Sequence, residues 1–198
     1  MLLDNIYIDR EINDWVKYRW SLCEQRHKDS WSVPNAFLET LFTYKNDIKD
    51  LNKIETFIET GTYEGWTVDV VAKHFKQVYT IENKPEFIDP TIRTNNPNIN
   101  FYTDTSVKGL QNISSKIKGT RCVILLDAHD EYNSPIVEEL KIIKQFYNKQ
   151  SVILVDDTCD LGQGTWPTKE LFEALILNIN SEYNIIYTDT GRGICLIY

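Results

Sequence analysis

The sequence predicts an α/β fold built on a mostly parallel sheet, and three observations lead to this prediction. Short apolar segments typical of strands recur near 55–59, 77–81, 99–102, 121–126 and 151–155. Segments with helical spacing separate them, near 65–75, 85–93, 106–117 and 134–147. Strands that alternate with helices form parallel sheets with right-handed crossovers. A helix near 167–180 and two last strands, 183–187 and 193–198, complete the pattern as a C-terminal antiparallel hairpin.

The fourth and fifth strands are expected to be buried on both faces. Segments 121–126 and 151–155 are near-continuous runs of Val, Ile and Leu, as strands buried on both faces of a sheet are. The turn of the last hairpin is expected at 188–192, which contains a glycine.

The first 50 residues are predicted to form a helical, aromatic-rich N-terminal extension. Pro34 is expected to start a helix that contains Phe37 and Phe42. Aromatic residues at helical spacing most often belong to a core, but a lid and a dimer contact stay open. The predicted organisation is therefore an extension at 1–50, acting as cap or lid, and a catalytic domain at 51–198.

Composition limits the class of protein. The chain has 198 residues, enough for one domain with a short extension. Its net charge of −8 argues against broad binding of nucleic-acid phosphates. No segment approaches the ~20 apolar residues of a membrane span, and no signal peptide is evident. The four cysteines lack metal-type spacing, and Cys122 and Cys195 lie in apolar strands, which favours a reduced, cytoplasmic protein.

The segment around 57–65 has the pattern of a cofactor-binding loop. An apolar strand ends at Glu59, Gly61 lies in the turn, and Gly65 precedes a helix. The next strand ends in Glu82, which is 82 − 61 = 21 positions after Gly61. An open parallel sheet binds a nucleoside-bearing cofactor with this order of strand, glycine loop, helix, strand and acid. The alternative is an ordinary strand-to-helix turn.

The glycine spacing separates cofactor classes. A dinucleotide fingerprint needs Gly-x-Gly-x-x-Gly, so that the backbone can approach a pyrophosphate. Here Gly61 is alone in the tight turn, and Glu64 lies where it would repel a pyrophosphate. The sequence therefore disfavours a dinucleotide, although an oxidoreductase on the same sheet stays an alternative.

The pattern Glu59-x-Gly61-x-x-x-Gly65 resembles the first motif of the class I S-adenosylmethionine-dependent methyltransferases. The resemblance implies a Rossmann-like methyltransferase fold with a seven-stranded sheet and S-adenosylmethionine as cofactor. It implies that the loop faces the methionine part, that Glu82 binds the ribose hydroxyls and that Asp104 contacts the adenine. Asp104 could instead cap the next helix, and Glu59 could brace the loop. The implied cofactor-binding residues are Glu59, Gly61, Thr62, Tyr63, Gly65, Glu82, Asp104, Thr105 and Asp127.

A second motif follows the fourth and fifth strands, with Asp127-Ala128-His129 after one and Asp156-Asp157 after the other, 156 − 127 = 29 positions apart. It resembles the metal-dependent sugar O-methyltransferases related to macrocin O-methyltransferase. The resemblance implies that Asp127, Asp156 and Asp157 bind a divalent cation, Mg²⁺ or Mn²⁺, and that His129 and Asp127 are catalytic, with His129 as base. Ala128 departs from the family's glycine, and His129 replaces its commoner aspartate. Asp130 is then a rival for the base or for a metal ligand.

Each of these roles has an alternative. Asp127 could bind the cofactor's amino group without metal, and 156–157 could be a solvated turn. His129 could be a structural hydrogen-bonding residue. Trp166, in the loop after the acid pair, could stack on a sugar or pack against the sheet.

The predicted function is metal-assisted O-methylation of a sugar or glycan-like small molecule. Carboxylate ligands suit hard divalent ions, which lower the pKa of a bound hydroxyl. Histidine has the pKa to accept its proton. The predicted partner is this small-molecule or glycan acceptor, with no nucleic acid and no membrane, and a homo-oligomer is possible. A non-catalytic binding protein on the same fold, or an oxidoreductase, is the alternative.

Overall fold

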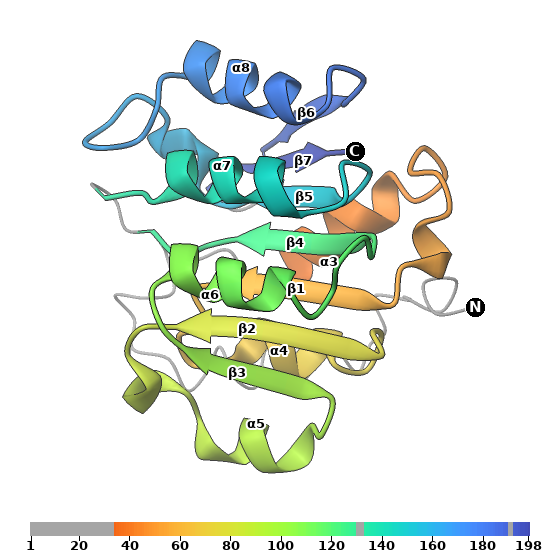
Figure 1. Ribbon diagram of the computed structural model, residues 1–198, viewed down its shortest axis with the longest axis vertical. Helices are drawn as coiled ribbons and strands as arrows, with labels where there is room; N and C mark the ends of the chain where they lie inside the picture. Colours follow the sequence, from red (N-terminus) through yellow and green to blue (C-terminus); the bar gives the residue numbers. More distant parts are fainter. Residues whose placement is uncertain (1–33, 130–132, 190–191) are drawn as a thin grey trace.

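Figure 1 shows a computed structural model of the chain, which describes residues 34–129, 133–189 and 192–198. A seven-stranded sheet in the order β3-β2-β1-β4-β5-β7-β6 forms the middle of the molecule. The first five strands are parallel, and β7 runs antiparallel to both β5 and β6. The predicted mostly parallel sheet with a C-terminal antiparallel hairpin is confirmed.

The strands lie within two residues of the predicted segments. Their bounds are β1 Thr56–Thr60, β2 Gln77–Glu82, β3 Ile99–Thr103, β4 Cys122–Leu126, β5 Val152–Val155, β6 Ile185–Thr188 and β7 Ile194–Ile197. All residues of β4 and β5 are buried, as their near-continuous apolar sequences predict.

The helices connect the strands, with one departure from prediction. Their bounds are α3 Pro34–Thr43, α4 Trp66–Val71, α5 Pro90–Asn95, α6 Ser106–Ser114, α7 Ile136–Phe146 and α8 Lys169–Ile179. The helix predicted near 85–93 is divided into a 3₁₀ turn, Pro85–Phe87, and α5. Pro90 cannot continue a preceding helix, and the Asp89 side chain accepts the Thr91 N–H to start a new one.

Two clusters of buried hydrophobic side chains lie on the two faces of the sheet. Successive strand residues point to opposite faces, so Phe57 packs with α3 and α4 while Ile58 packs with α6, α7 and α8. The sheet is therefore covered by helices on both sides, and the ends of its strands are where a ligand site is expected.

Part of the predicted N-terminal extension is described. Helix α3 begins at Pro34, as predicted, and buries Phe37, Leu38 and Leu41 in one of the sheet's cores. The Phe37 ring lies 5.6 Å from that of Phe57 on β1. Helix α3 therefore belongs to the core. The cap or lid predicted for 1–50 stays a prediction, because residues 1–33 of this extension lie outside the described residues.

The cysteines of the strands are small buried hydrophobes, as predicted. Cys122 and Cys195 have no exposed surface, and burial raises the pKa of each thiol to about 12. Across the described ranges, no helix combines the length and apolar character that crossing a membrane requires.

Candidate functional site

A cavity of about 960 Å³ opens at the carboxyl ends of the parallel strands. The connection after β1 leads to β2, and the one after β3 leads back to β4 on the other side of β1. Open α/β sheets bind ligands at such a topological switch point. The cavity is lined by residues 61–67, 81–84, 87, 104–106, 127–129, 133–135, 156–157, 165 and 192.

The turn after β1 brings two backbones into contact across the switch point. Gly61 has a φ of +83°, and a Cβ there would lie 2.1 Å from the carbonyl oxygen of Asp127. The Gly61 and Thr62 N–H groups donate to the Ile81 carbonyl at 2.9 and 3.2 Å. Only glycine fits this position, so its role in the predicted motif has a steric cause.

Glu82 lies at the end of β2 with its carboxylate held by the glycine loop. Its side chain accepts the Tyr63 N–H at 2.8 Å and the Lys84 N–H at 2.9 Å. Tyr63 adopts the left-handed conformation, φ 48°, and its ring lies 5.3 Å from Phe87 at the cavity wall. The predicted ribose-binding acid and the glycine loop are therefore joined directly.

Glu59 lies behind the loop rather than in the cavity. It is 1% exposed and accepts a hydrogen bond from the Thr80 hydroxyl at 2.7 Å. Thr80 in turn lies 2.6 Å from the Thr62 hydroxyl. Burial raises the pKa of Glu59 to about 8, against the effect of the Thr80 hydrogen bond. This arrangement is the bracing role that the sequence left open.

Asp104 and Thr105 line the cavity just after the end of β3. The Asp104 carboxylate accepts the Thr105 N–H at 2.9 Å, and Thr105 itself is the N-cap residue of α6. Asp104 therefore lines the cavity, and the N-cap position of α6 belongs to Thr105 rather than to Asp104.

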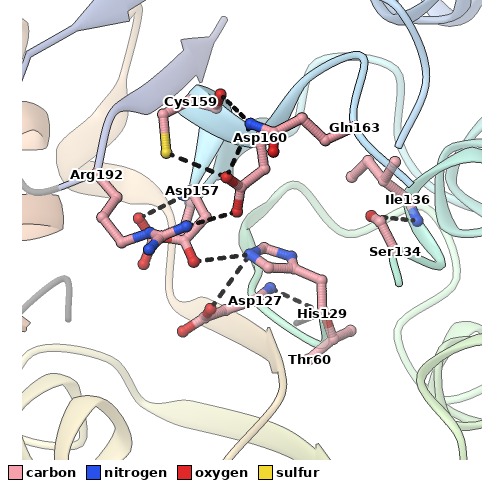
Figure 2. A network of polar contacts seen from close by, with 11 residues as sticks. Thr60, Asp127, His129, Ser134, Ile136, Asp157, Cys159, Asp160, Gln163 and Arg192 are labelled. Atoms are coloured by element: carbon pink, nitrogen blue, oxygen red, sulfur yellow. Dashed lines mark hydrogen bonds and ion pairs between the residues drawn. The ribbon is translucent and has the colours of Figure 1, made fainter. Parts of the chain in front are cut away.

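Figure 2 shows the acids and the histidine at the ends of β4 and β5. His129 Nε2 lies 3.7 Å from Asp127 Oδ1 and 3.8 Å from Asp157 Oδ2. The His129 side chain is 1% exposed, and the edge of its ring meets Trp166, with centroids 4.4 Å apart. Trp166 is itself buried, so it packs inside the site rather than offering an open stacking surface.

Arg192 completes this cluster from the C-terminal hairpin, and the sequence prediction missed it. Its Nε lies 3.1 Å from Asp157 Oδ1, and its Nη2 donates to Asp160 Oδ2 at 2.7 Å (Figure 2). The strand topology could have indicated it. Arg192 just precedes β7, and because β7 runs antiparallel to β5, the start of β7 lies at the carboxyl end of β5.

Acidic side chains gather at this edge of the sheet, and in the absence of a ligand burial favours their neutral form. Burial and the nearby Asp156 raise the pKa of Asp127 well above its ordinary value. Burial and Asp156 also raise the pKa of Asp157 to about 7, against the effect of Arg192. Burial raises the pKa of Glu139, below the cavity on α7, to about 7, although the hydroxyls of Ser106 and Thr60 lower it. The site therefore suits a ligand that carries positive charge.

No protein-family model matches this chain, and no curated protein matches it. Several solved structures, in contrast, are similar to this chain in fold. An O-methyltransferase from Bacillus cereus in complex with SAH is 14% identical, with 99% of this chain and 94% of that one covered and a TM-score of 0.64. The O-methyltransferase TomG from Streptomyces achromogenes, involved in tomaymycin synthesis and in complex with SAM, is 13% identical, with coverages of 96% and 89% and a TM-score of 0.59. Fibrillarin from Aeropyrum pernix, with natively bound S-adenosyl-L-methionine, is 12% identical, with coverages of 84% and 77% and a TM-score of 0.54.

The chain has the Rossmann-like methyltransferase fold. At these identities the likeness establishes the fold, and the chemistry has to be argued from the chain's own residues.

The methyltransferase fold brings nearly all the predicted site residues to one cavity. Except for Glu59, every one of them lines it: Gly61, Thr62, Tyr63, Gly65, Glu82, Asp104, Thr105, Asp127, His129, Asp156 and Asp157. Asp130, the rival base, lies outside the described residues. Ala128 is not in the left-handed region, so the change from glycine carries no backbone strain.

The predicted metal ligands Asp127, Asp156 and Asp157 line the same cavity, but their side chains are not arranged to coordinate one ion. Within the described ranges, no three His, Cys, Asp or Glu side chains are arranged to hold an ion. Asp157 is turned toward Arg192 and His129, and Asp156 Oδ1 accepts the Asp157 N–H at 2.8 Å. As placed, these side chains do not fit a metal ion.

Proposed function

We propose that this protein is an S-adenosylmethionine-dependent methyltransferase that transfers a methyl group to a hydroxyl oxygen of a small molecule. The observation that carries the proposal is the position of Glu82, which is 9% exposed, bound by two backbone N–H groups and in one cavity with the Gly61 turn. A carboxylate there suits two ribose hydroxyls. The cofactors named for the Bacillus cereus and Streptomyces structures support the same ligand.

The charge of the site also supports this cofactor. S-adenosylmethionine carries a positive sulfonium and an ammonium group, and Asp127, Asp156 and Asp157 line the cavity beyond the glycine loop. A preorganised negative wall stabilises positive charge in a site with little water. Asp127 is the proposed partner of the cofactor's amino group, and Gly61, Thr62, Tyr63 and Gly65 are proposed to face its methionine part.

The proposed reaction is an in-line displacement. The acceptor oxygen attacks the methyl carbon, the S–CH₃ bond breaks, an O–CH₃ bond forms, and S-adenosylhomocysteine leaves. His129 is the proposed base for the hydroxyl proton, and Asp127 and Asp157 flank the imidazole where they can stabilise its protonated form. Positioning of the two substrates in one cavity contributes the rest of the rate.

A sugar or glycan-like acceptor is the finer part of the proposal. The cavity wall beyond His129 is polar, with Asn133, Ser134 and Thr165 beside the two carboxylates of the β5 loop. Ser134 N–H donates to the Thr165 hydroxyl at 2.8 Å, which joins the two loops of that wall. Hydrogen-bonding groups of this kind suit an acceptor with several hydroxyls.

Metal assistance remains a separate prediction from the sequence. Burial and the nearby Asp156 raise the pKa of Asp127, and a bound cation would relieve the repulsion between these carboxylates, which favours metal assistance, whereas the ion pair of Asp157 with Arg192 opposes it. No step of the proposed reaction depends on an ion.

The test is isothermal titration of S-adenosylmethionine and S-adenosylhomocysteine, with Mg²⁺ and with EDTA, and with NAD⁺ as the control ligand. Micromolar binding of both sulfur compounds, without binding of NAD⁺, is expected. Binding of NAD⁺ alone would favour the oxidoreductase. Absence of binding by all three ligands would favour a non-catalytic protein. Cofactor binding without S-adenosylhomocysteine formation on any of a panel of sugars would overturn the sugar acceptor, and a heat that needs Mg²⁺ would support metal assistance.

A further inference from the structure

The C-terminal hairpin contributes a charged side chain to the site described above. We propose that Arg192 is a positioning residue, which holds the Asp157 carboxylate beside His129 and so completes the acceptor side of the cavity. The proposal deepens the methyltransferase function and rests on it for its catalytic consequence, although the positioning itself is a property of the folded chain.

Arg192 joins two carboxylates of one loop. Its Nε lies 3.1 Å from Asp157, and its Nη2 donates to Asp160 at 2.7 Å. Asp160 is 3% exposed, and its backbone N–H donates to the Asp157 carbonyl at 3.0 Å. Two carboxylates this close repel each other unless a cation lies between them. The fork of a guanidinium can bond to both at once, which a lysine ammonium on its flexible stem does less well.

The backbone of the hairpin is fixed to the same loop. The Thr158 N–H donates to the Gly193 carbonyl at 3.0 Å, and the Cys159 N–H donates to the Arg192 carbonyl at 3.1 Å. Gly193 has a φ of +91°, and a Cβ there would lie 2.8 Å from the Thr158 hydroxyl. Arg192 is therefore held from both its backbone and its side chain, as a residue that orients another must be.

Asp157 needs such support because its own backbone is strained. It follows β5 in the left-handed region, φ 53°, where a non-glycine residue is uncommon. In that conformation its second oxygen, Oδ2, faces His129 at 3.8 Å while Oδ1 faces Arg192. Arg192 therefore acts on His129 through Asp157, from the far side of the carboxylate (Figure 2).

The experiment compares Arg192→Gln and Arg192→Lys with Arg121→Gln as the matched control. The Arg121 side chain likewise bonds to two groups, the backbone carbonyls of Lys49 and Gln150, but it lies at the opposite end of the sheet and contacts none of the described carboxylates of the site. The first measurement is the ¹⁵N chemical shift of the His129 ring nitrogens at one fixed pH. Both Arg192 variants should move the His129 signals and leave those of His74 in place, and Arg121→Gln should move neither.

The second measurement separates kcat from KM. A catalytic base misplaced by about 1 Å loses roughly 100-fold in rate, so Arg192→Gln should lower kcat by about that factor while affinity for S-adenosylhomocysteine stays near wild type. Arg192→Lys should lose less, and added guanidinium ion should restore part of the rate of Arg192→Gln.

The outcomes distinguish this inference from the proposed function. His129 signals that stay unchanged in a folded Arg192→Lys protein would overturn the positioning role, whatever the activity. Absence of S-adenosylhomocysteine binding by the wild-type protein would remove the methyltransferase function and leave the ring-nitrogen result to decide the positioning role. A lowered melting temperature with unchanged His129 signals would mean that Arg192 only stabilises the hairpin.

Discussion

His129 is the residue on which the proposed chemistry depends most. Its ring lies between Asp127 and Asp157 and against Trp166, so it is held in one orientation at the cavity wall. We expect His129→Ala to lower turnover by ~10²–10⁴-fold, the usual contribution of a general base. Binding of S-adenosylhomocysteine should change little, because the other proposed cofactor residues follow β1, β2 and β3 and the substitution leaves Asp127 in place.

The control for His129→Ala is His74→Gln. His74 follows α4, away from the cavity, and burial lowers its pKa. Turnover should be unchanged in the control, measured as S-adenosylhomocysteine formed. Undiminished turnover of His129→Ala would assign the base to another group, and Asp127 would be the next candidate.

Glu82 tests the cofactor half of the site. Glu82→Gln keeps the shape but places an amide group where the carboxylate accepts the Tyr63 and Lys84 N–H groups. Loss of charge-assisted hydrogen bonding to the ribose costs ~1.5–3 kcal/mol, so affinity for S-adenosylmethionine should fall by about 10- to 150-fold in calorimetry. Glu86→Gln, on the exposed turn that follows, is the matched control and should bind as the wild type does. Equal affinities of all three proteins would remove Glu82 from the cofactor site.

The sequence predicted the site residues that belong to a motif, but it did not predict which side chains those residues contact. The Glu59, Gly61 and Glu82 spacing predicts a cofactor edge because strand ends meet at one edge of a parallel sheet. The ion pair of Asp157 with Arg192 could not be predicted in this way. Arg192 is separated from it by α8 and β6, and only the pairing of β7 with β5 brings them together.

At the scale of elements, strands were better predicted than helices. All seven strands lie within two residues of their predicted segments, and the near-continuous apolar sequences of β4 and β5 mark the strands that are buried on both faces. The 85–93 segment has apolar residues at helical spacing, but Pro90 and the Asp89 cap divide it. Local backbone chemistry overrides periodicity there, because proline lacks the N–H that an uninterrupted helix would need.

The β1–α4 turn can be tested as an element. A Cβ on Gly61 would collide with the Asp127 carbonyl at 2.1 Å, and neither backbone can move without separating β1 from β4. We expect Gly61→Ala to lower the free energy of unfolding by more than about 4 kcal/mol, as severe backbone strain does, and to abolish cofactor binding.

Gly119 provides the matched control for that substitution. Its φ of +76° is nearly that of Gly61, but a Cβ there meets nothing within 4 Å. Gly119→Ala should therefore cost only the left-handed strain of a non-glycine residue, ~1–2 kcal/mol, and leave cofactor binding intact. Urea unfolding of both variants measures the difference. Equal losses would mean that conformation, and not the contact with Asp127, makes Gly61 necessary.

At the scale of the whole molecule, the buried acids should make stability depend on pH. Burial raises the pKa of Glu59 to about 8 and that of Glu139 to about 7, from ordinary values of 4.5. The folded state therefore binds more protons than the unfolded state between those values, and stability falls as pH rises. His74, whose pKa burial lowers, has the opposite effect, but only below its ordinary value of 6.5.

Between about pH 6.5 and about pH 8.5 the buried acids affect stability and His74 does not. We expect the free energy of unfolding of the ligand-free protein to fall as pH rises through this range. Each pKa unit corresponds to ~1.4 kcal/mol, so Glu59 alone contributes a loss on the order of 2 kcal/mol across this window. Glu59→Gln and Glu139→Gln, which cannot ionise, should each flatten the dependence measured by urea unfolding. A wild-type stability that rises with pH would mean that both acids are ionised in the folded state, with their charge balanced by the protein. The folded site would then contain more negative charge than burial of neutral acids allows, and a cationic ligand would be bound more strongly at neutral pH.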